Sequence, residues 1–219
     1  NLIFGGYHEL FSFKSKEDKM EYLRELVDSN LFRDIFEMEQ IRNPKKIKDL
    51  LTLLAFQIGR EVSLSELAGN LDLHINTVYR YLDLMEKSFI IVNIRGFSRN
   101  LRKEVAKTSR YYFYDNGIRN ALIQNFNPFS LRDDIGQLWE NFMVMERFKK
   151  QSYEKILSNN YFWRTYDQQE IDFVEEREGK LFGYEFKWNS EKARKNPPPA
   201  WHKAYPDANY ENITRDHYM

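Results

Sequence analysis

Residues 161–188 read YFWRTYDQQEIDFVEEREGKLFGYEFKW and predict two neighbouring β-strands joined by a charged turn. The first strand is expected over residues 170–175 and the second over residues 180–188, since both are rich in aromatic and branched apolar residues. The segment between them, EEREGK, is polar and contains Gly179, which suits a hairpin turn. A β-hairpin is therefore predicted in the C-terminal part of the chain.

Three ionisable side chains are predicted to meet on this hairpin. Asp172 lies between apolar neighbours, and Glu185 and Lys187 are two residues apart, so they point to the same face of their strand. A hard cation such as Mg²⁺ or Mn²⁺ needs only one or two protein carboxylates, and an ammonium beside it can stabilise charge on a phosphate. The set suits a metal-dependent phosphodiesterase site. A solvated Glu–Lys pair, worth only tenths of a kcal/mol, remains an open alternative.

Composition limits the classes of protein to which the chain can belong. Its 219 residues, 42% hydrophobic and 30% charged, suit one large or two small globular domains. The absence of cysteine excludes disulfides and Cys-type zinc sites and is typical of the cytoplasm, where we expect the protein. The four histidines are not spaced as HExxH, which argues against a zinc hydrolase. No apolar run reaches membrane-spanning length and no signal peptide is visible, so no membrane association is expected.

The middle of the chain follows the order of a winged helix-turn-helix. Ser63, with Glu66 three residues later, predicts a capping box at the start of a short helix. A helix precedes it, and a further helix and two strands follow it. The predicted elements are helices over residues 45–60 and 63–73, a third helix from about Asn76, and strands over residues 89–97 and 111–114.

The third helix and the wing would contact double-stranded DNA. In this motif the third helix enters the major groove, where its early side chains meet base edges and phosphates. Although the whole chain has a formal net charge of 0, residues 74–110 hold eight Lys or Arg and three Asp or Glu. Winged helices also dock proteins, so DNA contact and protein docking both stay open. The candidate contacts are Asn76, Thr77, Tyr79 and Arg80 in the helix and Arg99, Arg102 and Lys103 in the wing.

Helices are also predicted on both sides of this motif. Residues 16–42 have helical spacing and suit a connector that ends at Asn43-Pro44. A long helix is expected over residues 131–150 with Ser130 as its N-cap and Asp133 and Asp134 in its first turn. Glu140 falls near the middle of this helix, where its spacing predicts an ordinary exposed side chain. Strands over residues 161–165 and 210–214 and a short helix over residues 201–204 complete a small α/β domain.

Segments spread over most of the chain carry a family resemblance. They are LVDSNLFRDIFEME, LSELAGNLDLHINTVYRYLDLMEKSFII, YYFYDNGIRNAL, DIGQLWENFMVMERF, YFWRT, EIDFV and YEFKW. With these segments the chain resembles the C-terminal part of prokaryotic ATP-binding proteins, in which a domain of unknown function follows an AAA-type core. The resemblance implies that this chain is a fragment whose partner, the ATPase core, precedes it and alone binds ATP. No GxxxxGKS/T phosphate loop occurs, so the fragment is not expected to hydrolyse ATP. Self-association into a homo-oligomer is left open.

The last third of the chain also resembles the restriction-endonuclease-like PD-(D/E)xK fold. Asp172 matches the Asp of that pattern, and Glu185 and Lys187 match its Glu-x-Lys. Glu140 matches the acidic residue that the preceding helix often contributes, so the resemblance implies metal ligands at Asp172, Glu185 and Glu140. The chain departs from the pattern in one respect, because Glu170-Ile171 stands where a proline usually precedes the Asp.

The expected fold class is α/β (α+β) with a mixed central sheet in the nuclease-like part. The predicted division is a helical connector over residues 1–44, a winged helix over 45–115 and the nuclease-like domain over 116–219. The first functional hypothesis is a metal-dependent deoxyribonuclease that the winged helix delivers to DNA. The second is a non-catalytic module that binds DNA or protein, and a toxin-like or signalling interaction domain is a third, weaker alternative.

Overall fold

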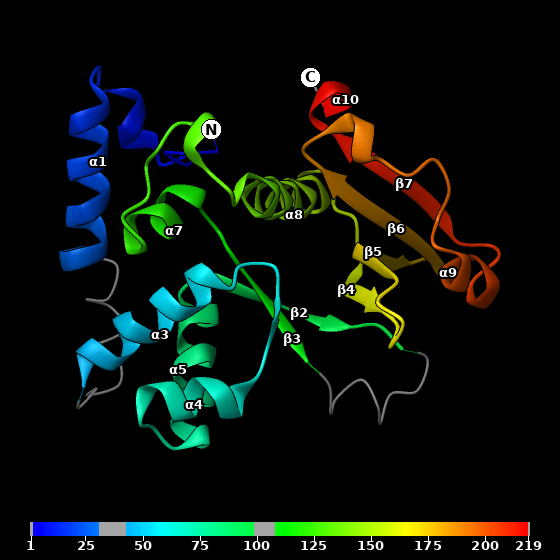
Figure 1. Cartoon of the computed structure of the whole chain (residues 1–219), viewed down its shortest axis with the longest axis horizontal. Coiled ribbons are helices and arrows are strands. Elements are labelled where there is room, and N and C mark those ends of the chain that lie inside the picture. Colours follow the sequence, from blue (N-terminus) through cyan, green and yellow to red (C-terminus); the bar gives the residue numbers. More distant parts are fainter. Residues whose placement is uncertain (1, 31–42, 99–107, 219) are drawn as a thin grey trace. The chain divides into compact units, whose positions relative to one another are not determined.

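The computed structural model describes residues 2–30, 43–98 and 108–218 (Figure 1). Two compact units account for them. Unit 1 comprises Asn1–Asn93 and Tyr111–Asp133, and unit 2 comprises Ile94–Arg110 and Asp134–Met219. Strands β2 (Ile91–Gly96) and β3 (Ser109–Phe113) contribute residues to both units. The predicted three-domain division stays a prediction.

Unit 1 contains the order of helices and strands that the sequence predicts for a winged helix. The side chains that helical spacing places on one face of the third helix, such as Val78, Leu82 and Met85, are buried in its apolar core. The described elements are α1 (Lys16–Glu25), the helical turns His8–Phe11 and Leu26–Asn30, α3 (Pro44–Phe56), β1 (Glu61–Val62), α4 (Leu64–Leu71), α5 (Ile75–Lys87) and α7 (Asn116–Leu122).

The ends of α4 and α5 follow local rules that the sequence partly revealed. The Ser63 side chain accepts a hydrogen bond from the Glu66 amide at 3.4 Å, as the predicted capping box requires. The helix expected over residues 63–73 ends at Leu71, and the next residue, Asp72, takes the left-handed conformation with φ 50°. Helix α5 begins at Ile75, one residue before the predicted start.

A partly buried carboxylate, Asp115, fixes the N-terminal segment, residues 2–7, within unit 1. Asp115 caps α7 by accepting from the Gly117 amide at 2.7 Å, and it also accepts from the Gly6 amide at 2.6 Å. Burial raises the pKa of Asp115, while these backbone N–H groups oppose that rise. Asn120 adds a second anchor, because its side chain donates to the Ile3 carbonyl at 2.7 Å.

Unit 2 is a mixed sheet with one long helix, α8 (Ile135–Tyr153), and two short ones, α9 (Pro199–Ala204) and α10 (Arg215–Tyr218) (Figure 1). Its strands pair in the order β2-β4-β5-β6-β7. Pairs β4/β5 and β5/β6 are antiparallel, and pairs β2/β4 and β6/β7 are parallel, which confirms the mixed α/β class. The remaining strands are β4 (Asn159–Arg164), β5 (Glu170–Arg177), β6 (Lys180–Lys187) and β7 (Asn209–Thr214).

The hairpin predicted from residues 161–188 is present as β5 and β6. Arg177 pairs with Lys180, so the loop consists of Glu178 and Gly179, with φ values of 51° and 73°. Positive φ at both loop residues matches the right-handed twist of the strands, and glycine adopts it without strain. The tight loop fixes the register of the two strands that carry the candidate site.

The start of α8 was predicted wrongly. Ser130 does not cap it but lies in a short 3₁₀ turn, Phe129–Leu131, and α8 begins only at Ile135. Asp133 and Asp134 therefore precede the helix rather than lying in its first turn. The cause is tertiary, because Arg132 is buried in unit 1, where it donates to the Asn120 side chain at 3.0 Å and takes an extended backbone.

Apolar packing on unit 2 centres on Trp201, which is fully buried in α9. Trp201 packs with Trp163, Ile171 and Leu181, and its ring lies where a Cβ on Gly183 would meet it at 3.4 Å. No helix in the described ranges is long and apolar enough to cross a membrane.

The anchoring of the N-terminal segment predicts a steric requirement at Gly117. A Cβ there would lie 2.2 Å from the Phe4 carbonyl oxygen, so we expect Gly117→Ala to lower the free energy of unfolding by about 2 kcal/mol or more. Gly69→Ala is the matched control, because a Cβ in α4 meets nothing within 4 Å and should stabilise the helix by about 0.5–1 kcal/mol. Urea denaturation measures both, and equal stabilities would contradict the close approach.

Candidate functional site

Strands β5 and β6 bring two acidic residues together. Phe173 pairs with Tyr184, so the antiparallel register places Asp172, the residue before Phe173, opposite Glu185, the residue after Tyr184. Both carboxylates belong to residues that are only 2% exposed. The sequence therefore locates two charged groups inside unit 2, where each needs a compensating partner.

Lys187 supplies that partner. Its Nζ lies 3.4 Å from Asp172 Oδ2 and 3.0 Å from Glu185 Oε1, and its side chain is 28% exposed. Alternation along β6 puts Lys187 on the same face as Glu185, as the sequence predicts. Asp172, Glu185 and Lys187 thus form one cluster in which a single ammonium is shared by two carboxylates.

The remaining contacts orient the two carboxylates. Asp172 Oδ2 also accepts from the Phe186 amide at 2.8 Å, while Oδ1 accepts no hydrogen bond from the described residues. Glu185 Oε2 accepts from the Tyr210 hydroxyl at 2.5 Å. Tyr210 was missed by sequence reasoning, because only the parallel pairing of β6 with β7 brings it beside Glu185.

Electrostatics in the cluster favour a protonated Lys187. Burial lowers the pKa of Lys187, but the charges of Asp172, Glu185 and the more distant Glu140 outweigh it and hold that pKa above its ordinary value. Burial raises the pKa of Asp172, although Lys187 and the Phe186 amide oppose this. Burial and the hydrogen bond to Glu185 raise the pKa of Tyr210. Lys187 is therefore a hydrogen-bond donor at neutral pH and not a general base.

Glu140 on α8 is not the exposed side chain that its helical spacing predicts. Its side chain is 16% exposed, and Oε1 lies 3.9 Å from Nη1 of the buried Arg110. Arg110 also pairs with Glu170 at 2.8 Å and stacks over the Phe162 ring at 4.3 Å. The prediction of exposure was wrong because Arg110 is remote in the chain and draws Glu140 inward. Arg110 itself was singled out only as one basic residue of the wing.

The predicted ligands Asp172, Glu185 and Glu140 suit a hard cation only in part. Asp172 and Glu185 offer the oxygen ligands that Mg²⁺ prefers, and two carboxylates are sufficient when water completes the shell. In the ranges 2–30, 43–98 and 108–218, no group of three or more His, Cys, Asp or Glu side chains is placed to hold a metal ion. The structure therefore brings Asp172 and Glu185 together but does not join Glu140 to them as a third ligand.

The predicted nucleic-acid contacts lie in unit 1. On α5, Asn76, Tyr79 and Arg80 are exposed, with Tyr79 61% accessible, while Thr77 is half-buried. Their contact with DNA stays a prediction. The wing residues Arg99, Arg102 and Lys103 lie outside the described residues.

Two family models match adjoining parts of the chain. A domain of unknown function (DUF8612) matches residues 1–128, and a second domain of unknown function (DUF4143) matches residues 135–211. The interval between the two matches contains residue 134, at which unit 2 resumes. No solved structure matches the chain.

Similar proteins are uncharacterised. The chain is 27% identical over 190 residues to uncharacterized protein Rv2008c of Mycobacterium tuberculosis, covering 85% of this chain and 42% of that protein. It is 27% identical over 221 residues to uncharacterized protein MJ1544 of Methanocaldococcus jannaschii, covering 97% of this chain and 46% of that protein. An uncharacterized protein of Haemophilus influenzae is 22% identical, covering 78% of this chain and 42% of that protein. The chain thus spans less than half the length of these relatives.

The shared ammonium predicts a pH-dependent effect of Lys187→Met. At neutral pH the variant leaves two buried carboxylates without their cation, so we expect the free energy of unfolding to fall by about 2 kcal/mol or more. Because the pKa of Lys187 is raised, its contribution is complete below the ordinary lysine pKa and is lost only as pH rises through the raised value. The deficit should shrink in acid as Asp172, whose pKa is raised by burial, takes up a proton.

Urea denaturation across the pH range measures this deficit. Lys180→Met is the matched control, because Lys180 is exposed beside the hairpin loop and should tolerate the change. A deficit that did not depend on pH would contradict the role of Lys187 as the neutralising charge.

Proposed function

The chain belongs to the family described as the domain of unknown function DUF8612, and we propose that it is a DNA-processing module. Unit 2 would hydrolyse phosphodiester bonds of DNA with a divalent metal ion, and α5 of unit 1 would contact the duplex. The observation that carries the proposal is the convergence of the Asp172 and Glu185 carboxylates on the Lys187 ammonium. The order of these three residues along β5 and β6 matches the Asp and Glu-x-Lys of the restriction-endonuclease-like pattern.

In this proposal each residue of the cluster has a distinct task. Asp172, through its Oδ1, and Glu185 would hold Mg²⁺ or Mn²⁺. A metal bound there supplies a Lewis acid for the phosphate and a water of lowered pKa. Lys187 remains protonated and would donate a hydrogen bond to the attacking water or to a phosphate oxygen. Tyr210 keeps the Glu185 carboxylate oriented through its hydroxyl.

The PD-(D/E)xK pattern usually has a proline before its Asp, and the absence of this proline here has little effect on the cluster of Asp172, Glu185 and Lys187. Glu170, which stands in that region, pairs with Arg110 at 2.8 Å instead of facing Lys187. Ile171 is fully buried in the apolar cluster around Trp201. The substitution therefore leaves the strand and the orientation of Asp172 supported by other contacts.

A non-catalytic binding module is the second candidate, and one observation favours it. Lys187 already neutralises the two carboxylates, and no three-acid group suited to a metal occurs among the described residues. A cluster of this kind can stabilise an inactive nuclease-like fold without binding any metal. The proposal also includes an ATPase core that precedes this region in longer proteins and controls unit 2.

Plasmid cleavage separates the two candidates. We expect the protein to nick supercoiled DNA when Mn²⁺ or Mg²⁺ is added and Asp172→Asn to lower the rate by about 100-fold or more, since it removes a ligand charge. Calorimetric titration with Mn²⁺ should lose its binding heat in the same variant. Asp167→Asn is the control, because Asp167 is an exposed acid in the turn before β5 and leaves the cluster intact.

Two results would reject the catalytic proposal. Cleavage that survives both Asp172→Asn and Lys187→Ala would come from a contaminating nuclease. A protein that neither cleaves DNA nor binds Mn²⁺ would instead be the non-catalytic module.

DNA contact by α5 has its own test. Arg80 is exposed on α5, so we expect Arg80→Gln to weaken duplex binding and to reduce the slope of log K against log salt by about one. Fluorescence anisotropy with a labelled duplex measures both quantities. Lys16→Gln is the charge-matched control, since Lys16 is exposed on α1 of the same unit. Binding that did not change with salt would argue against phosphate contacts.

A further inference from the structure

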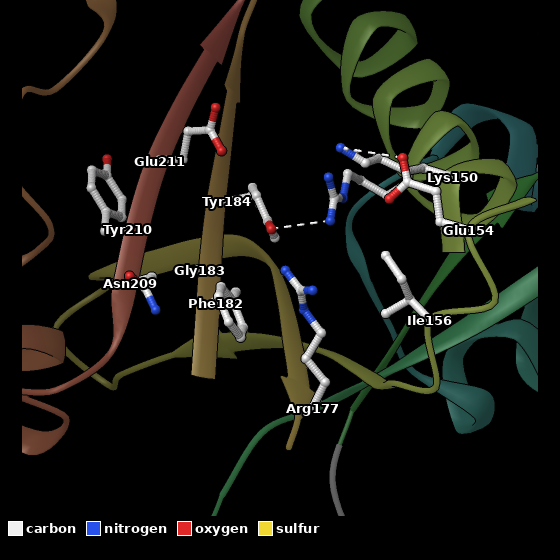
Figure 2. A pocket seen from close by; sticks show the side chains of 11 residues that line it. Lys150, Glu154, Ile156, Arg177, Phe182, Gly183, Tyr184, Asn209, Tyr210 and Glu211 are labelled. Atoms are coloured by element: carbon white, nitrogen blue, oxygen red, sulfur yellow. Dashed lines mark hydrogen bonds and ion pairs between the residues drawn. The ribbon is translucent and has the colours of Figure 1, made fainter. Parts of the chain in front are cut away.

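A cavity of about 460 Å³ in unit 2 lies between the C-terminal half of α8 and strands β6 and β7 (Figure 2). Its volume falls within the range of small-molecule sites, about 300–1,000 Å³. Neither Asp172 nor Glu185, Lys187 or Glu140 lines it. Tyr210, which donates to Glu185, borders both places, but the charged groups of the cavity differ from those of the candidate active site.

Two guanidinium groups line the floor of the cavity, and one fully buried carboxylate behind them pairs with both. Arg147, from α8, donates to Glu175 Oε1 through Nε at 2.7 Å and approaches the same oxygen through Nη2 at 2.6 Å. Arg177, from β5, has its Nε 3.2 Å from Glu175 Oε2. Glu175 is fully buried and Arg147 is 8% exposed. Two cations thus share one anion in a place where water has little access, which leaves one positive charge uncompensated.

The second of these pairs is incomplete. Arg177 Nε and Glu175 Oε2 lie within ion-pair distance but are not aligned for a hydrogen bond, and both are buried without a hydrogen-bond partner among the described residues. Aromatic rings hold the guanidinium groups in place, because Arg147 lies over Tyr184 at 4.2 Å and Arg177 over Phe182 at 3.9 Å. The Tyr184 hydroxyl accepts a hydrogen bond from Arg147 Nη2 at 3.0 Å, which Figure 2 marks with a dashed line. The donors are therefore pre-oriented, which lowers the entropic cost of binding an anion.

The rim limits the size of an anionic ligand. Lys150 on α8 pairs loosely with Glu154 at 3.9 Å, and the exposed Glu211 projects from β7 on the opposite side. Counting floor and rim together, the three basic side chains are matched by three acidic ones, so the cavity has no long-range attraction for a polyanion such as a DNA backbone. Its excess positive charge acts only at short range, on a small group that reaches the floor.

We propose that this cavity binds a small molecule through a phosphate group, held by Arg147 and Arg177 and by Lys150 at the rim. A phosphate offers several acceptor oxygens to two guanidinium groups that approach from different elements, and guanidinium–phosphate pairs are charge-assisted and directional. The remaining volume accommodates the organic part of the molecule. The proposal does not depend on nuclease activity, because it concerns different residues.

Calorimetric titration of the whole chain at low and high salt tests the proposal. The probes are inorganic phosphate, 5′-AMP, adenosine and acetate. Binding of phosphate and 5′-AMP, weakened by salt and absent with adenosine, is expected. A 5′-phosphorylated oligonucleotide tests the other source of the same group, and the acidic rim predicts that it binds more weakly than 5′-AMP. Stronger binding of acetate than of phosphate, or no binding by phosphate and 5′-AMP, would overturn the proposal.

Three variants place the binding in the cavity. Arg177→Gln should weaken 5′-AMP binding by about tenfold or more while leaving the Arg147–Glu175 pair balanced. Glu211→Gln should tighten it by about two- to fivefold, because the change removes a negative charge from the rim. Lys203→Gln is the control, since Lys203 is exposed on α9 and does not line the cavity. Equal affinity of Arg177→Gln and the wild type would overturn the assignment, with the thermal unfolding of each variant confirming that it is folded.

Discussion

Unit 2 depends on one electrostatic constraint: a carboxylate can be buried in it only with a cation beside it. Asp172 and Glu185 satisfy the constraint through Lys187, and Glu175 satisfies it through two arginines. Breaking such a pair is costly because the remaining charge has no access to water. Since the cations come from α8, β5 and β6, the same pairs that neutralise the charges also fix how the long helix lies on the sheet.

The balance of charge differs between the two clusters, and that difference separates their chemistry. At Lys187 two anions share one cation, so the residual charge is negative and suits a metal ion. At Glu175 two cations share one anion, so the residual charge is positive and suits an anionic group. The same physical rule, applied with opposite numbers of cations and anions, therefore yields two clusters of opposite residual charge within unit 2. A catalytic role and a purely structural role for the Lys187 cluster use the same contacts and differ in whether Asp172 Oδ1 binds a metal ion.

Local signals in the sequence predicted much of the fold. Gly179 located the hairpin loop, Ser63 with Glu66 located a helix start, and the spacing of Val78, Leu82 and Met85 identified a buried helix face. These features depend on residues close together in the chain. The start of α8 was predicted wrongly because Arg132 is drawn into a buried polar contact with Asn120, twelve residues earlier.

Only the part of the candidate site that lies on one hairpin could be predicted from the sequence. Asp172, Glu185 and Lys187 are brought together by two consecutive strands, so their spacing was informative. Tyr210 reaches Glu185 through the pairing of β6 with β7, 25 residues along the chain, and Arg110 reaches Glu140 and Glu170 through packing over longer separations. No local pattern encodes either contact. The Glu175 cluster gave no signal either, because a charged residue near a hairpin loop is usually solvated, whereas Glu175 is buried beside Arg147 of α8.

The alternation of side chains along β7 limits the insertions and deletions that the chain can tolerate before this strand. Its alternation sends the Tyr210 side chain toward Glu185, while Figure 2 shows Glu211 leaving the opposite side of the strand, beside the cavity. Inserting or deleting one residue just before Asn209 would reverse the two faces, so both sites would be lost in a single event. Selection should therefore tolerate changes of residue type in the preceding loop far better than changes of its length.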